Sequence, residues 1–202
     1  ASQNGFFSEC FIDELAAAAK KDPYEFRRHL LSKSPRHLAV LELAAQKARW
    51  NTPLPAGRFR GIAVLFAFES YAAQVIEISV NRSAKTLQVH RVVCAVDVGQ
   101  VVNPSTIVAQ SEGAVVYGLS AGLYGNITIA GGRVKETNFN NYPVLRLNEM
   151  PVVEVHIVPS TEKPTGAGEL SVPPVIPALC NAIFAATGKR IRRMPIQPED
   201  LA

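Results

Sequence analysis

The chain has 202 residues, of which 48% are hydrophobic and 19% are charged, and its formal net charge is +4. This composition excludes a disordered chain and is typical of a globular protein with a hydrophobic core, in one domain or two small ones. There is no run of 18 or more apolar residues, so we expect no membrane-spanning helix.

The first fifty residues are predicted to be helical. Apolar residues recur at helical spacing over 7–18, and Ser2 or Asn4 is the expected N-cap of this helix. A capping box at 22–25 and a Ser-Pro pair at 34–35 predict the starts of two further helices.

Residues 51–57 include two prolines and are expected to form a linker. Three β-rich runs follow it, over 58–68, 72–81 and 86–97. The later predicted elements are a small-residue helix from Asn103-Pro104 to about Leu123, a hairpin near 130–132, a strand over 152–158 and a helix over 177–187 that ends at Gly188. Together they predict an α+β fold with mixed sheets and packed helices, divided into a helical segment, 1–50, and an α+β portion, 58–202.

The cysteines and the basic residues exclude two kinds of site. The three cysteines lie far apart and have no metal-ligand spacing, so we expect core thiols rather than zinc or iron–sulfur ligands. The densest basic cluster, at 189–193, has no interleaved aromatic residues. That pattern favours a solvated or subunit-facing edge over a nucleic-acid site.

The stretch 165–174 contains a single carboxylate, Glu169, between small residues and apolar ones. Its two glycines allow the backbone to approach a ligand closely, because glycine has no Cβ. We expect the apolar residues that follow, such as Leu170 and Val175, to desolvate the carboxylate and favour its use as a general base. The alternative is a solvated loop glutamate just before a helix.

Gln110 is predicted to lie on a small-residue face of its helix, together with Ala114 and Gly118. A polar amide on such a face needs partners, because leaving it unsatisfied costs about 1–3 kcal/mol. An amide offers donors and acceptors that suit the edge of a heterocycle such as a pterin. A bond to the neighbouring backbone is the alternative.

Two motifs carry a resemblance to a known family. Gly166-Ala167-Gly168-Glu169, with Gln110-Ser111-Glu112-Gly113-Ala114 upstream, resembles the C-terminal part of the molybdenum-binding subunit of the xanthine oxidase family. The chain is most similar to the branch of isoquinoline oxidoreductase beta subunits and bacterial aldehyde oxidoreductases. Further matching stretches lie at 11–16, 22–28, 142–146 and 181–188. The resemblance covers essentially the whole chain in order and spacing.

The resemblance implies an oxidative hydroxylation of an aldehyde or an N-heteroaromatic compound, with water as the source of oxygen. By resemblance, Glu169 is the catalytic base, and the cofactor-binding residues are Gln110, Gly166, Ala167, Gly168, Ser2 and Gln3. The implied cofactor is molybdenum with molybdopterin cytosine dinucleotide. In the family the pterin holds the metal, so this chain is expected to supply no metal ligand.

The resemblance also implies partners. The family's molybdenum subunit is longer, so we expect this chain to be incomplete and inactive without its N-terminal part, whose Arg- and Gly-rich loop would end just before Ala1. The further implied partners are a subunit with 2Fe-2S clusters, a cytochrome c in some relatives, and a small-molecule substrate, but no nucleic acid. A periplasmic location is expected on the same basis.

Two departures from the family pattern keep other hypotheses open. Leu170 stands where a proline commonly follows the glutamate, and Leu65-Phe66-Ala67 stands where relatives often have His-Glu-Ser. These changes favour the alternative of a non-catalytic assembly or scaffold module. A third hypothesis, a free-standing small-molecule binding domain, requires a stable monomer without a large exposed apolar surface.

Overall fold

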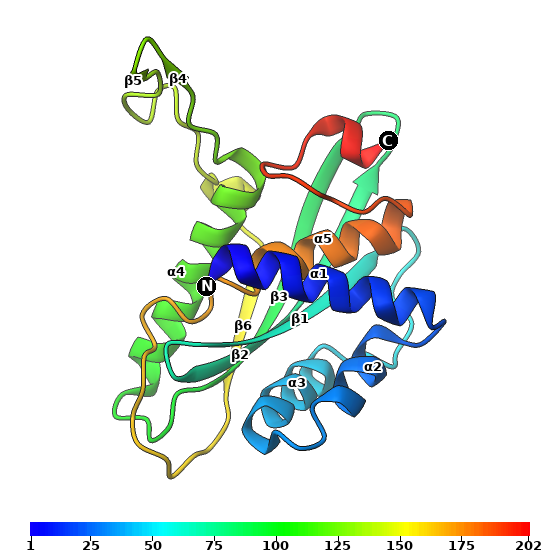
Figure 1. The fold of residues 1–202 in the computed structure, drawn as a ribbon, viewed down its shortest axis with the longest axis vertical. Coiled ribbons are helices and arrows are strands. Elements are labelled where there is room, and N and C mark those ends of the chain that lie inside the picture. Colours follow the sequence, from blue (N-terminus) through cyan, green and yellow to red (C-terminus); the bar gives the residue numbers. More distant parts are fainter.

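The computed structural model describes residues 1–202 and contains one four-stranded sheet in the order β1–β2–β3–β6 (Figure 1). The antiparallel strands are β1 (Phe59–Ala67), β2 (Ser70–Asn81) and β3 (Thr86–Asp97). The last strand, β6 (Val152–Ile157), pairs in parallel with β3. Parallel neighbours require a crossover, and the connection here contains α4 (Pro104–Tyr124).

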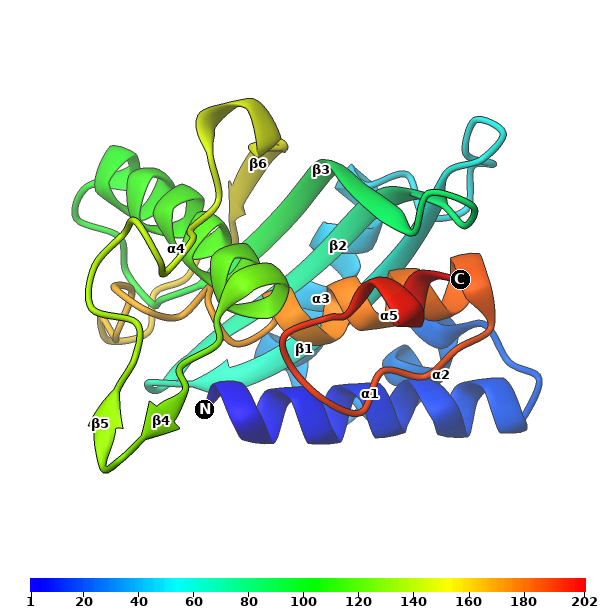
Figure 2. The same ribbon diagram turned by 90° about the horizontal axis from the view of Figure 1, so that it is seen from above.

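Helices cover both faces of the sheet (Figure 2). On one face, α5 (Val175–Thr187) lies across β1 and β2, and α1 (Ser2–Ala18) packs on α5. The opposite face is covered by α3 (Pro35–Lys47), which packs beside α2 (Pro23–Leu30). The expected α+β class is therefore confirmed.

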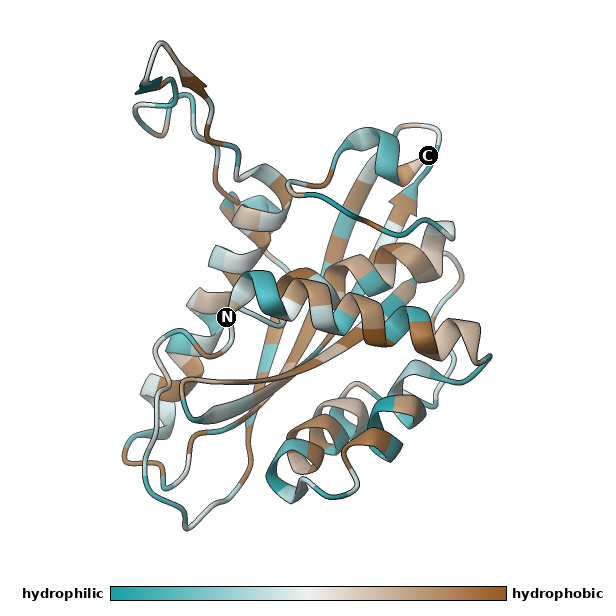
Figure 3. Cartoon of the chain, in the orientation of Figure 1, coloured by the Kyte–Doolittle hydropathy of each residue, from teal (hydrophilic) through white to brown (hydrophobic).

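The core consists of two layers separated by the sheet. Val75 points into the cluster around α3, whereas its neighbour Ile76 points into the cluster around α5, and both are fully buried. Strands buried on both faces are apolar at consecutive positions, which Figure 3 shows along the sheet and α5. The three cysteines are buried and free, as expected of core thiols.

The helix ends agree with the sequence expectations in part. α1 begins at Ser2, so Ser2 and Asn4 lie inside its first turn and the expected cap is wrong. Asp22 accepts two backbone N–H bonds at the start of α2, whereas Ser34 makes no side-chain cap bond to α3. Gly188 adopts the left-handed conformation after α5, which confirms the predicted end of that helix.

A buried ion cluster joins α1 to α2 and to the C-terminal segment. Arg27 is 1% exposed and donates to Glu9 at 2.8 Å and to Asp13 at 3.3 Å. Glu9 also accepts the backbone N–H of Val64 in β1, and Arg190 donates to Asp13 at 2.7 Å. The helical segment is thus fastened to the sheet, and the division at 51–57 stays a prediction.

The basic cluster at 189–193 is partly neutralised within the chain. Arg190 bonds to Asp13 and lies over the ring of Phe184, and Arg192 pairs with Glu14 of α1. These contacts place that part of the cluster against α1.

The remaining elements are short. The strands β4 (Ile129–Ala130) and β5 (Arg133–Val134) form a hairpin that extends away from the body of the molecule (Figure 1). Two 3-10 helices, η1 (Leu147–Glu149) and η2 (Pro198–Leu201), complete the fold. None of the helices combines the length and apolar character that crossing a membrane would need.

Candidate functional site

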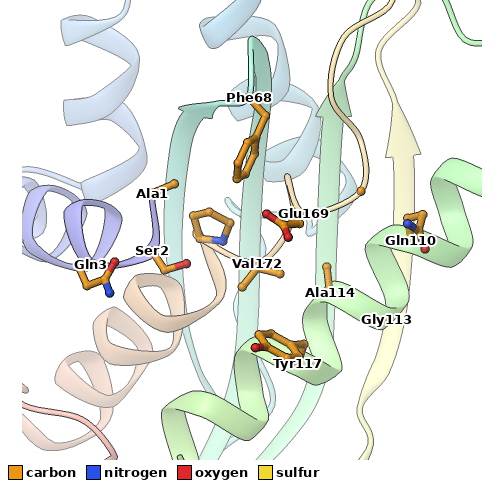
Figure 4. Close-up of a pocket in the computed structure, with 12 residues that line it drawn as sticks. Ala1, Ser2, Gln3, Phe68, Gln110, Gly113, Ala114, Tyr117, Glu169 and Val172 are labelled. Carbon is orange, nitrogen blue, oxygen red and sulfur yellow. The ribbon is translucent and has the colours of Figure 1, made fainter.

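A cavity of about 580 Å³ opens where the start of α1, one face of α4 and the loop between β6 and α5 meet (Figure 4). The turn between β1 and β2 contributes Phe68 to its wall. Five of the seven residues predicted for the site line this cavity: Ser2, Gln3, Gln110, Gly168 and Glu169. The fold therefore brings together residues that are up to 167 positions apart in the sequence, from Ser2 to Glu169.

Glu169 faces the cavity and is exposed, and its side chain makes no hydrogen bond (Figure 4). The expected desolvation by Leu170 and Val175 is wrong, because both side chains turn into the core. Of the residues that follow, Val172 and Pro173 lie in the cavity wall. The carboxylate is consequently a free acceptor at an open site.

The α4 wall is made of residues at helical spacing. Gln110, Gly113, Ala114 and Tyr117 line the cavity, whereas Gly118 faces Val175 of α5. A Cβ on Gly118 would lie 2.7 Å from Val175 Cβ, so close helix packing explains this glycine.

Gln110 differs from the sequence expectation, because it is exposed and has no hydrogen-bond partner in the chain. It therefore carries no penalty for burial, and the alternative of a bond to neighbouring backbone is not seen. The amide that the core does bury is Gln74 of β2, which is fully enclosed. Gln110 thus offers donors and an acceptor to whatever occupies the cavity.

The two small residues before Gly168 support the site from outside the cavity. Gly166 donates its N–H to the carbonyl of Phe68 at 3.2 Å, and a Cβ there would lie 2.9 Å from Phe68 Cβ. Ala167 packs against the core cluster that contains Leu170. Gly168 does line the cavity, and a Cβ on it would lie 3.7 Å from Gln110 Nε2.

Phe68 is one of the cavity residues that sequence reasoning missed. Phe68 and Glu69 form the two-residue turn of the β1–β2 hairpin, and both have positive φ, at 55° and 62°. Such turns normally favour Asn or Gly, so the sequence carries no signal for this one. Tyr117, also missed, lies seven residues after Gln110, and that helical spacing indicates a shared face.

The carboxylate of Asp97 lies outside the cavity lining and is bonded within the chain. Burial works to raise the pKa of Asp97 at the end of β3, but bonds from Arg36 and the Gly99 N–H outweigh it and lower that pKa. No group of three or more His, Cys, Asp or Glu residues is placed to hold a metal ion.

Comparisons with known proteins agree with the sequence and the fold. A sequence model of the molybdopterin cofactor-binding domain matches residues 12–151. The isoquinoline 1-oxidoreductase subunit beta of Brevundimonas diminuta is 35% identical over 98% of this chain and 26% of its own length. The membrane-bound aldehyde dehydrogenase (pyrroloquinoline-quinone) of Gluconacetobacter polyoxogenes is 37% identical over 96% of this chain and 27% of its own.

A solved structure shows the same fold. The aldehyde oxidoreductase of Desulfovibrio gigas matches 99% of this chain and 40% of its own, with a TM-score of 0.71 and 14% identity. The chain belongs to the molybdopterin cofactor-binding domain family, which confirms the resemblance in the sequence. It spans about a quarter of the length of the two curated relatives.

Proposed function

We propose that this chain is the part of a molybdenum hydroxylase that contacts the pterin and supplies the catalytic base. The whole protein would oxidise an aldehyde or an N-heteroaromatic compound, with water as the source of oxygen. The activities named for the two relatives, isoquinoline oxidation and aldehyde oxidation, support this class of substrate. One observation carries the proposal: an unpaired carboxylate, Glu169, and an unpaired amide, Gln110, face the same cavity.

The residues present fit a pterin cofactor. The side chains of Ser2, Gln3 and Gln110 line the cavity without polar partners in the chain, so their donors and acceptors are free for a heterocycle edge. Gly113 leaves open space above α4, since a Cβ there would meet no atom within 4 Å. When bound, the cofactor would supply the metal centre that takes up electrons from the substrate.

Glu169 would act by accepting a proton. A general base needs an available lone pair within hydrogen-bond reach of the proton that it removes. No protein donor occupies the Glu169 carboxylate, and Val172 and Phe68 line the same cavity. Gln110, Ser2, Gln3 and Gly168 would hold the cofactor within reach of that carboxylate.

The finer details of cofactor and partners are part of the proposal. We infer the cytosine dinucleotide form of the pterin, a partner subunit with 2Fe-2S clusters, and the remainder of the molybdenum-binding subunit. We also infer a cytochrome c as the electron acceptor and a periplasmic location. The Brevundimonas relative is a beta subunit, which supports assembly with other chains.

Leu170 and Leu65, one residue from each of the two departures noted in the sequence, have structural explanations that do not require loss of catalysis. Leu170 is 1% exposed and fills a core cluster beside β2 and β3, so the position contributes packing. Leu65 packs against Gly5 of α1, where a Cβ would lie 2.6 Å from Leu65 Cδ1. The scaffold alternative therefore gains no support from Leu170 or Leu65.

The test is an analysis of the purified protein that contains this chain. We expect about one molybdenum and one pterin per chain, and the cytosine dinucleotide should be released on denaturation. Gln110→Ala should lower the pterin content, whereas Gln46→Ala, which lies outside the cavity, should leave it unchanged. Absence of both molybdenum and pterin would favour the scaffold, and recovery of pyrroloquinoline quinone instead would refute the proposed cofactor.

A further inference from the structure

The position of Glu169 depends on the residues that follow it, because its own side chain is bonded to nothing. Leu170 and Ser171 are each 1% exposed, so the chain passes directly from the cavity into the core. The backbone turns back on itself there, with the Val172 N–H donating to the Glu169 carbonyl at 3.0 Å. Whatever fixes Leu170 and Ser171 therefore also fixes the proposed base.

Ser171 is bonded to three different elements. Its Oγ donates to Ser111 Oγ of α4 at 3.0 Å and lies 3.4 Å from Cys94 Sγ of β3. Its carbonyl accepts a bond from Gln74 Nε2 of β2 at 2.8 Å. All four residues are at most 2% exposed. The Gln74 Oε1 is buried without a partner, but the bonds between the other polar groups of this network hold their elements in a single arrangement.

This buried network ties together the two walls of the cavity. Ser111 is the next residue after Gln110, so the same turn of α4 presents the amide to the cavity and the hydroxyl to Ser171. On the cavity side, the loop and α4 also lie close together, since a Cβ on Gly168 would lie 3.7 Å from Gln110 Nε2. The buried Ser171–Ser111 bond consequently limits how far Glu169 and Gln110 can move apart.

We propose that Ser171 and Ser111, supported by Gln74, are positioning residues that fix Glu169 relative to the cofactor-binding face of α4. This inference rests on the proposed function, in which Glu169 is the base. A displacement of about 1 Å at a reacting group can reduce a rate about 100-fold, even when the altered residue lies away from the reaction. The hydroxyl groups of Ser171 and Ser111 touch neither substrate nor cofactor in this arrangement.

The first test measures kinetics of the whole assembled protein, with rates expressed per bound molybdenum. Ser171→Ala and Ser111→Ala should each lower kcat at least 10-fold and leave KM within about 2-fold. The double variant should be no more than about 2-fold slower than the worse single variant, because both changes remove one bond. Ser79→Ala, which deletes a hydroxyl bonded to His90 at 2.7 Å in the sheet, should leave kcat unchanged.

The second test does not depend on turnover. Hydrogen exchange of the loop 166–172 should become faster in Ser171→Ala and Ser111→Ala than in wild type, and should be unaltered in Ser79→Ala. If Ser171→Ala does not assemble, Ser111→Ala alone decides the result. Wild-type kcat per molybdenum and wild-type loop exchange in Ser111→Ala would overturn the inference.

A companion variant separates this inference from the proposed function. If Glu169→Gln abolishes turnover while both serine variants keep wild-type kcat per molybdenum, the positioning role fails and the base assignment stands. If Glu169→Gln keeps turnover within a few-fold of wild type, the proposed function itself fails. A fall in activity that only follows a loss of molybdenum would identify the serines as structural and overturn their positioning role.

Discussion

Two regions of this molecule hold carboxylates in opposite ways. In the ion cluster between α1 and α2, Glu9 and Asp13 are buried and bonded to Arg27, and a backbone N–H and a second arginine use further acceptor sites. In the cavity, Glu169 is exposed and bonded to nothing. The ion cluster therefore satisfies its charges within the chain, whereas the cavity leaves its polar groups free for a ligand.

The largest stability effect is expected in the ion cluster. Arg27→Ala would leave the buried Glu9 without a charged partner and Asp13 with Arg190 alone, which should cost about 3–5 kcal/mol of unfolding free energy. Arg28→Ala, one residue later, removes an exposed arginine paired with Glu42 in solvent and should cost far less. Urea denaturation of both variants measures the difference. Equal costs would show that the cluster does not fasten the framework.

Two glycines show the same contrast between a closely packed framework and an open cavity. A Cβ on Gly61 of β1 would lie 2.2 Å from Ala182 N and 2.3 Å from Ala178 O of α5. Because these are backbone atoms, Gly61→Ala should force the sheet and α5 apart and cost about 1–3 kcal/mol. Urea denaturation measures that cost, and a midpoint equal to wild type would contradict the predicted close contact.

Gly113 in the cavity wall should behave in the opposite way. A Cβ there meets no atom within 4 Å, so Gly113→Ala should stabilise α4 by up to about 1 kcal/mol. The added methyl group would face the cavity, and we expect it to lower the pterin content. A variant that is more stable and keeps its full pterin content would show that the cofactor does not approach this face.

These glycines and the cavity residues show how far the sequence could be read. The strand over Thr86–Asp97 and the helix from Pro104 follow from local pattern, because apolar runs and an Asn-Pro start specify them within the segment itself. The role of Gly61 could not be predicted, since it depends on where α5 crosses β1. The position of Phe68 in the cavity wall could not be predicted either, because Phe68 and Glu69 form a turn with positive φ that these residue types do not favour.

The site itself was predicted in part. Glu169 and Gln110 share a cavity, but the expected desolvation of Glu169 failed because Leu170 turns inward to fill the core. The direction of a side chain in an irregular loop depends on tertiary packing and not on neighbouring residue types. Neither Gly166 nor Ala167 lines the cavity, because Gly166 bonds to the Phe68 turn and Ala167 packs against the core cluster that contains Leu170.

A smaller stability effect than that of Arg27→Ala is expected at Asp97, a buried carboxylate whose arginine partner is partly exposed. Its pKa is lowered, so this carboxylate contributes stability above its unfolded pKa of about 3.9 and loses it as pH falls through the lower folded pKa. Arg36→Ala should therefore destabilise the protein at neutral pH, and the difference from wild type should shrink in acid. The Gly99 N–H bond remains in the variant, which limits the loss. A difference in urea midpoint that grows below pH 4 would contradict this assignment.

The most direct test of the free carboxylate is the turnover of Glu169→Gln in the whole assembled protein, compared with Glu162→Gln. Both glutamates are exposed and lie between β6 and α5, but only Glu169 lines the cavity. We predict that Glu169→Gln lowers kcat per molybdenum at least 100-fold, because its amide cannot accept the proton, at unchanged molybdenum content. Glu162→Gln should match wild type. Turnover of Glu169→Gln within a few-fold of wild type would contradict the assignment of Glu169 as the base.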